Sequence, residues 1–515
     1  MDELRDISPR EYQKSIVKTA RDYNTLVILP TGIGKTLIAL MLSIERIKKF
    51  PGKKVLILAP TKPLVEQHLE SFNKQLPELF AETNIFTGAV NPHNRKRIWR
   101  SAEIIFSTPQ CVANDIKNNL YGLEDVSLLV IDEAHRCLKN YDYTFIANTY
   151  KNQATNQRIL GLTASPGSEK NKVHEICKNL DIDKLEVRTR DSEDVKPYLQ
   201  ELEFKKQEVP FPKEFIEIRL LLKRIYDSKI EQLKNRNLLF EPANKITLLK
   251  LQSKLSSQVS PGNFNIMVGM SLCAQAIKIS HAIELLETQT LSGLNEYLKN
   301  LEKQAKEKKS KGVQTLVNSP EFKATTLSLS RLIEKKVEHP KVEELKVLIE
   351  DEIKNNEKAK IIIFTQFRET ANTIVNRLNE IEKINAKTFV GQAKKQSSSG
   401  SSGLSQKEQR EVIEKFKSGN INVLCATSIG EEGLDIPEVN AVYFYEPIPS
   451  EIRKIQRAGR TARLSKGKLV ILITKGTRDE IYHYASIAKE KKMRRTIESV
   501  KEDLKDKNKT LNNFK

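Results

Sequence analysis

Val27-Ile-Leu-Pro-Thr-Gly-Ile-Gly-Lys-Thr36 is the stretch around which the rest of the chain is arranged. An apolar run ends in a turn with two glycines, and apolar residues at helical spacing follow Thr36. This order predicts a strand, a phosphate-binding loop and a helix whose N-terminus faces the phosphates. The two glycines would let the backbone approach phosphate oxygens. Lys35 is expected to reach the β- and γ-phosphates of ATP, and the Thr36 hydroxyl to bind Mg²⁺.

The loop has a shortened form of the phosphate-loop pattern, because Leu29 stands where the full pattern has a glycine. An ordinary strand–turn–helix is the alternative explanation. Gln13 lies in a predicted helix just before the loop and is expected to present its amide to the adenine edge, unless it is a solvated surface glutamine. The residues expected to line the nucleotide are Gln13, Leu29, Pro30, Thr31, Gly32, Ile33, Gly34, Lys35 and Thr36.

The charge balance is strongly basic, with a formal net charge of +20 over 515 residues. Such a charge favours a polyanionic partner, nucleic acid first and an anionic membrane second, although a lysine-rich background proteome would also produce it. The length predicts two to four domains.

The sequence carries no C-x-x-C pair among its five cysteines, which are therefore expected to be small core residues of a cytosolic protein. The N-terminus does not resemble a signal peptide, and we expect no apolar run long enough to span a bilayer. We accordingly expect a cytoplasmic, nucleoid-associated protein without a membrane partner.

Two further apolar runs end in hydroxyl-bearing residues. Val55–Pro60 leads into Thr61 and Lys62, and Ile104–Ser107 leads into Thr108. Ligand-contacting loops lie at the carboxyl ends of parallel strands, so these side chains would suit nucleic-acid backbone phosphates. The alternative for each threonine is an ordinary helix N-cap.

Leu128–Ile131 is a fourth buried run, and it ends in Asp132-Glu-Ala-His135. Asp132 is expected to hold Mg²⁺, and Glu133 to orient and deprotonate the attacking water. Alternating strands and helices from about 20 to 166 predict one doubly wound parallel domain.

Beyond this domain the pattern changes twice. Residues 169–336 show helical spacing and frequent lysines, which predicts an all-helical insertion. Residues 337–502 predict a second α/β domain, and residues 503–515 a polar, frayed tail. The low-complexity stretch 397–403 is given no function.

Taken in order, these motifs resemble those of superfamily 2 helicases. The chain more narrowly resembles the archaeal Hef helicase and Fanconi anaemia M (FANCM) translocase family, in Pro60–Val65, Gly161–Gly167, His281–Glu287, Phe389–Gln392 and Tyr445–Pro447. The resemblance implies an α/β fold of two RecA-like doubly wound parallel-sheet domains with a helical insertion that grips branched DNA, such as forks and Holliday junctions.

The resemblance also implies further roles. Arg460 and Arg463 would reach across the cleft to the γ-phosphate, and Gln456 would help to place the water or that phosphate. Nucleotide contacts are also expected at Gly433 and Asp435. The residues expected to couple the two sites are His135, Thr163 and Ser165. The residues expected to contact nucleic acid are Thr61, Lys62, Thr108, Pro109, Thr365, Arg368 and Thr427.

Two alternative functions stay open at this point. One is a double-stranded RNA-activated ATPase of the Dicer-like group, although no RNA-specific module is visible. The other is a non-enzymatic scaffold, against which the intact Lys35, Asp132, Glu133, Arg460 and Arg463 argue. The Glu-Arg-Lys-x-x-x-Asp signature of the nuclease that continues many Hef chains does not occur in these residues, so no cutting activity is expected from them, and a nuclease or clamp partner is unknown.

Overall fold

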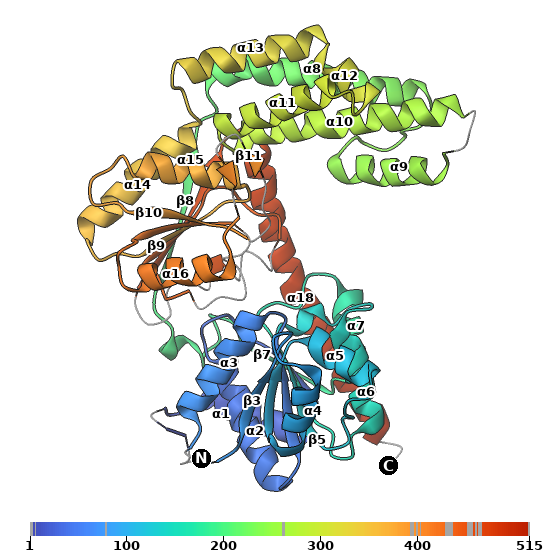
Figure 1. Cartoon of the computed structure of the whole chain (residues 1–515), viewed down its shortest axis with the longest axis vertical. Helices are drawn as coiled ribbons and strands as arrows, with labels where there is room; N and C mark the ends of the chain where they lie inside the picture. Colours follow the sequence, from blue (N-terminus) through green and yellow to red (C-terminus); the bar gives the residue numbers. More distant parts are fainter. Residues whose placement is uncertain are drawn as a thin grey trace.

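The chain folds into two parallel-sheet lobes and a helical bundle that lies between them in the sequence, which confirms the expected fold class (Figure 1). The lobe that holds the first sheet is the N-terminal lobe, and the lobe that holds the second is the C-terminal lobe. The computed structural model describes residues 4–5, 7–77, 80–259, 263–391, 396–397, 400–401, 403–427, 436–450, 457–458, 461 and 466–512.

Seven parallel strands form the first sheet. Their order across the sheet is β3 (Thr83–Phe86), β4 (Ile104–Ser107), β2 (Lys54–Leu58), β5 (Val126–Ile131), β6 (Ile159–Thr163), β1 (Thr25–Ile28) and β7 (Lys184–Val187). The central strands are continuous apolar runs because helices cover the sheet on both faces.

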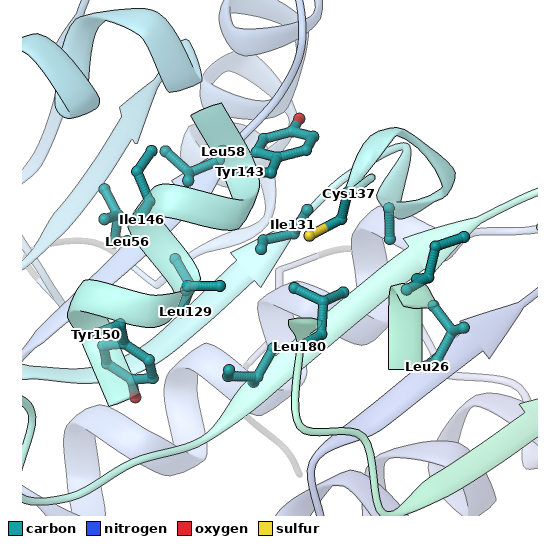
Figure 2. Packing of buried hydrophobic residues seen from close by; sticks show 14 of the residues in the cluster. Leu26, Leu56, Leu58, Leu129, Ile131, Cys137, Tyr143, Ile146, Tyr150 and Leu180 are labelled. Carbon is teal, nitrogen blue, oxygen red and sulfur yellow. The ribbon is translucent and has the colours of Figure 1, made fainter. Parts of the chain in front are cut away.

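Alternate strand residues face the two helical layers. Val27, Val55 and Val130 pack toward α1 (Glu11–Asp22), α2 (Lys35–Lys49) and α3 (Lys62–Gln75). Leu26, Leu56 and Leu129 pack toward the opposite layer, where Figure 2 shows them with Tyr143, Ile146 and Tyr150. That layer contains α4 (Pro92–Ser101), α5 (Pro109–Lys117), α6 (Asp142–Gln153) and α7 (Lys170–Asn179).

Six parallel strands form the second sheet. Their order is β10 (Ala386–Phe389), β13 (Val423–Ala426), β9 (Ile361–Phe364), β14 (Ala441–Phe444), β15 (Gly467–Thr474) and β8 (Leu202–Val209). One face packs against α14 (Pro340–Asn355) and α15 (Arg368–Leu378), and the other against α16 (Gln406–Lys417). Within the low-complexity stretch and its flank, Gln396–Ser397 and Gly400–Ser401 form the short antiparallel pair β11–β12.

Helices make up the bundle, which lies beyond the C-terminal lobe at the end of the molecule opposite the N-terminal lobe (Figure 1). They are α8 (Lys213–Asn235), α9 (Lys245–Ser257), α10 (Phe264–Thr288), α11 (Leu291–Lys306), α12 (Lys311–Val317) and α13 (Pro320–Glu334). The bundle therefore begins at Lys213 and not at residue 169 as expected, because α7 and β7 belong to the first lobe and β8 is the edge strand of the second sheet. The strand β8 lacks an apolar run because most of its side chains are not buried.

The last helix, α18 (Arg478–Asn512), also differs from the expectation. It starts beside the bundle and runs down onto α7 of the N-terminal lobe, so the segment expected to fray is helical through Asn512 (Figure 1). Lys170 Nζ lies 2.8 Å from Asp503 Oδ2, and Leu504 packs against the N-terminal core. The helix therefore links all three parts of the molecule.

No apolar run long enough to span a bilayer was expected, but among the described residues one helix has the length and composition for it. This helix is α10, Phe264–Thr288. In this fold α10 is instead the central helix of the bundle and contacts α8, α9, α11 and α12. Burial against other helices accounts for its apolar composition.

Buried charges tie the bundle to the C-terminal lobe. Lys341 and Asp479 are fully buried, with Lys341 Nζ 2.8 Å from Asp479 Oδ2, and Lys341 also donates to the carbonyl of Thr288 on α10. Arg478 Nη1 donates to the carbonyl of Ser280 at 2.6 Å. A buried, hydrogen-bonded ion pair tolerates little displacement, so the bundle and the C-terminal lobe are held in one arrangement.

Candidate nucleotide site and its link to the second lobe

Side chains of helix α1 contact the phosphate loop and hold it in shape. Gly32 and Gly34 both have φ of +84°, a conformation that side chains with a Cβ rarely adopt. A Cβ on Gly34 would lie 2.3 Å from Nε2 of Gln13, so the helix and the loop are in direct contact. Tyr12 Oη donates to the carbonyl of Ile33 at 2.5 Å. The loop is therefore held in shape by side chains from α1.

The Gln13 amide is engaged within the protein. Its oxygen accepts from the backbone N–H of Arg10 at 2.9 Å, and its nitrogen lies 3.4 and 3.3 Å from the carbonyls of Ile33 and Gly34. In this structure Gln13 thus positions the loop, and its expected contact with adenine stays a prediction.

Lys35 and Thr36 are the first two residues of α2, at the end of the helix that attracts anions. The ammonium group of Lys35 donates to the carbonyl of Leu29 at 3.1 Å, folding back over the loop. The hydroxyl oxygen of Thr31 is buried and has no hydrogen-bond partner within the described part of the chain. A phosphate oxygen is a ligand that could satisfy it.

Asp132 is held at the carboxyl end of β5 by two side chains. His68 Nε2 donates to Asp132 Oδ2 at 2.9 Å, and Tyr143 Oη donates to the Asp132 carbonyl at 2.8 Å. Burial raises the pKa of the Asp132 carboxyl, but the hydrogen bond and charge of His68, followed by the charge of Lys35, outweigh it and lower the pKa. Asp132 is therefore poised as a carboxylate.

Glu133 has a strained backbone, with φ of +49°. Its Oε2 is buried without a hydrogen-bond partner in the described residues, although His135 Nδ1 lies 3.2 Å away. An oriented carboxylate oxygen with spare accepting capacity suits a group that takes a proton from water.

The donor set fits a magnesium nucleotide. The strands β1 and β5 are separated by β6 alone, so their carboxyl ends lie about 10 Å apart. The Thr36 hydroxyl and the Asp132 carboxylate are hard oxygen donors, which Mg²⁺ prefers. The described residues contain no cluster of three or more His, Cys, Asp or Glu side chains that could hold a metal.

A chain of polar contacts runs from Glu133 into α18. His135 Nδ1 lies 3.2 Å from Thr163 Oγ1, and the Thr163 hydroxyl donates to the Ser165 carbonyl at 3.0 Å. Ser165 Oγ then donates to Met493 Sδ at 2.8 Å. The three residues expected to couple the sites are thus connected, and their path ends on a helix that begins in the C-terminal lobe.

Four residues of the N-terminal lobe were expected to contact nucleic acid, and they differ in how accessible they are. Thr61 and Thr108 occupy N-cap positions of α3 and α5, but neither side chain caps its helix. The simple capping explanation therefore fails for both. Lys62 is accessible and lies 3.7 Å from Glu66, whereas Pro109 is buried in the first turn of α5 and cannot contact a ligand in this arrangement.

The expected contacts in the C-terminal lobe point inward. Thr365 is fully buried, with its hydroxyl 3.2 Å from Glu446 Oε2, and Thr427 is also buried. The Thr365 hydroxyl also lies 3.5 Å from Oε1 of Gln289, the C-cap residue of α10 in the bundle. Arg368 Nη2 donates to the carbonyl of Gly391 at 3.0 Å.

Five expected residues of the second lobe, Gly433, Asp435, Gln456, Arg460 and Arg463, lie outside the described residues. Four residues that contact the site were not expected from sequence, namely Tyr12, His68, Tyr143 and Met493. His68 carried no local signal beyond following Thr61–Gln67, and Met493 lies far from every motif.

Three family models match successive parts of the chain. Residues 10–173 match the DEAD/DEAH box helicase, and residues 340–465 match the helicase conserved C-terminal domain. Residues 214–339 match the helical bundle of a putative ATP-dependent RNA helicase. The matched helical bundle coincides with the part that starts at Lys213 in the structure.

Individual proteins match nearly the whole chain. A putative ATP-dependent RNA helicase of Methanocaldococcus jannaschii is 38% identical over 96% of the chain and 61% of its own length. The Fanconi anemia group M protein homolog of Mus musculus is 33% identical over 92% of the chain and 25% of its own length. The chain thus spans about three fifths or less of these relatives. The crystal structure of the Pyrococcus furiosus Hef helicase domain is 42% identical, with a TM-score of 0.71, and the match covers 94% of this chain and 100% of that one.

Proposed function

Because the chain belongs to the Hef and FANCM-like helicases of superfamily 2, we propose that it is an ATP-dependent motor acting on branched DNA such as forks and Holliday junctions. The observation that carries the proposal is that Lys35, at the start of the helix after β1, and Asp132 and Glu133, at the end of β5, lie at one edge of the sheet with only β6 between the two strands. A role in replication-fork repair and recombination is part of the proposal.

The residues would act as follows. The loop amides, Lys35 and Thr36 bind the triphosphate, and Asp132 completes the magnesium site. Mg²⁺ would supply positive charge that offsets charge developing on the phosphates. Glu133 orients the attacking water and accepts its proton.

Movement would come from linking this site to the bundle. The contacts from His135 through Ser165 reach α18, and the start of α18 is anchored to α10 and Lys341. A change at the nucleotide site would therefore bias the position of the bundle and C-terminal lobe together. Arg460 and Arg463 are proposed to approach the γ-phosphate when the lobes close.

The binding of DNA would depend mainly on backbone phosphates. The net charge of +20 and the accessible Lys62 support a contact of low sequence specificity and strong salt dependence. Duplex RNA is the second candidate substrate, because the M. jannaschii relative and the matched bundle carry the word RNA in their names.

Measuring ATP hydrolysis by the whole chain against a substrate panel tests the proposal. The panel contains single-stranded, duplex, forked and four-way DNA and duplex RNA at equal nucleotide concentration. We expect the forked and four-way DNA to stimulate hydrolysis most. Stronger stimulation by duplex RNA would assign the chain to RNA, and no stimulation by any polynucleotide would reject the motor.

A further inference from the structure

The free end of the helical bundle exposes large apolar side chains. Phe240, in the connection between α8 and α9, is 84% exposed, and Phe264, at the start of α10, is 72% exposed. Ile246 and Leu249 on α9 and Met267 on α10 are also exposed. We call residues 234–259 and 263–267 the bundle tip. Exposed aromatic rings are costly to keep in water, so such a cluster indicates a binding surface.

A small core of its own supports the bundle tip. Leu233, Leu248 and Cys273 are buried there together, and Cys273 Sγ lies 3.1 Å from the carbonyl of Leu248. Arg236 Nη1 donates to Asn265 Oδ1 at 3.1 Å, which fixes the end of α8 beside the start of α10. The exposed rings are therefore presented from a packed scaffold and are not part of its core.

The charge of the bundle tip complements a polyanion. Five basic residues and one acidic residue, Glu241, give residues 234–267 a formal charge of +4. The basic residues are Lys234, Arg236, Lys245, Lys250 and Lys254. Lys245 Nζ lies 3.0 Å from Glu284 Oε2 on α10 and is paired with it. The other four lysine and arginine side chains leave the surface of the bundle tip basic.

Basic and apolar side chains share one face of α9. Ile246, Lys250 and Lys254 recur every four residues, and Leu249 lies three residues after Ile246. A helix that lies on a membrane separates its apolar and basic side chains onto opposite faces. Proteins that bind unpaired nucleotides instead interleave positive charge, for the backbone, with flat aromatic rings, for the bases.

We propose that the bundle tip binds unpaired nucleotides at a DNA branch, with Phe240 and Phe264 stacking on bases and the neighbouring lysines contacting phosphates. This inference rests on the proposed function, and it adds a base-contacting site to a backbone-binding motor. Figure 1 shows α9 on the side of α10 that faces the N-terminal lobe, so the tip lies toward the lobe that carries the phosphate loop.

The test compares base stacking with phosphate binding directly. Fluorescence anisotropy measures binding of the full chain to a fork with two unpaired arms, and to the same fork with abasic arms that keep every phosphate. We expect the wild type to bind normal arms about tenfold more tightly, because one aromatic–base stack contributes about that factor. Phe240→Ala/Phe264→Ala should bind both forks equally.

A matched control and a second ligand complete the design. Leu327, on α13 of the same bundle, is 55% exposed and lies outside the tip, so Leu327→Ala should keep the preference for normal arms. Equal melting temperatures would show that all variants fold. An unchanged preference in the double variant overturns the inference. It is also overturned if the double variant loses only binding to phosphatidylserine vesicles, which would make the tip a membrane contact.

The same experiment separates the two proposals. Absence of fork-stimulated ATP hydrolysis in the wild type would reject the motor itself. Fork-stimulated hydrolysis together with equal binding to normal and abasic arms would reject the base-contacting tip alone.

Discussion

The Ser165 hydroxyl donates a hydrogen bond of 2.8 Å to the sulfur of Met493, joining the end of β6 in the N-terminal lobe to α18. Both side chains are buried, and Ile497 and Val500 of the same helix belong to the N-terminal core. The position of α18 is thus set at one end by the nucleotide lobe and at the other by the bundle.

Met493→Leu should uncouple these ends while keeping the packing, because leucine has a similar volume and no hydrogen-bond acceptor. We expect ATP binding to be unchanged and DNA-stimulated hydrolysis to fall about two- to fivefold, the worth of one modest hydrogen bond. Ser499→Ala is the matched control. Ser499 lies on the same helix as Met493, and the substitution removes only an exposed contact with Lys170 of α7. Equal effects of both variants would exclude a specific role for the Ser165 contact.

His68 should matter through Asp132. Replacing it with leucine removes the donor to Asp132 Oδ2, whereas glutamine keeps a nitrogen donor at similar reach. We expect His68→Leu to weaken magnesium-dependent binding of a fluorescent ATP analogue about tenfold or more, because the partner of a metal ligand fixes its orientation. His68→Gln should restore most of this binding, and equal losses in both variants would argue for a packing role.

Glu446 should make stability depend on pH. Its side chain is 1% exposed. Burial, together with the negative charge of Asp479, raises its pKa to about 7, although the positive charges of Lys341 and Arg457 oppose this shift. The folded state therefore favours the protonated form. Its contribution to stability is complete below the unfolded pKa of about 4.5 and is lost as the pH rises through 7.

Glu446→Gln imitates the protonated carboxyl and keeps an acceptor for Thr365. We expect the variant and the wild type to unfold alike at pH 4, and the variant to be more stable by about 1–3 kcal/mol at pH 8. Denaturant unfolding at the two pH values measures this difference. A difference independent of pH would show that Glu446 does not titrate in this range.

Periodicity predicted the buried strands well, because a strand covered on both faces must be apolar along its length. It missed β7 and β8, which lie at sheet edges and carry charged residues such as Glu203 and Lys205. Missing these two strands also placed the start of the helical bundle too early, at residue 169 instead of Lys213. Edge strands are defined by which neighbour they pair with, and local sequence does not specify that neighbour.

The candidate site shows the same division. Glycine and hydroxyl spacing located Gly32, Lys35 and Thr36, since a phosphate loop is a local structure. His68 is 64 residues from Asp132, and Met493 is 328 residues from Ser165, so no local pattern could pair them. Thr365 was placed correctly at a strand end, but its burial depended on Gln289 and Glu446 from other elements.

The central claim is that hydrolysis at Glu133 drives movement on branched DNA, and a single-turnover fork-unwinding assay with Glu133→Gln tests it most directly. The variant should bind ATP and forks as the wild type does, because the glutamine keeps the shape of the site. It should lose hydrolysis and unwinding together, by about 100-fold or more. Unwinding by Glu133→Gln at the wild-type rate would contradict the account.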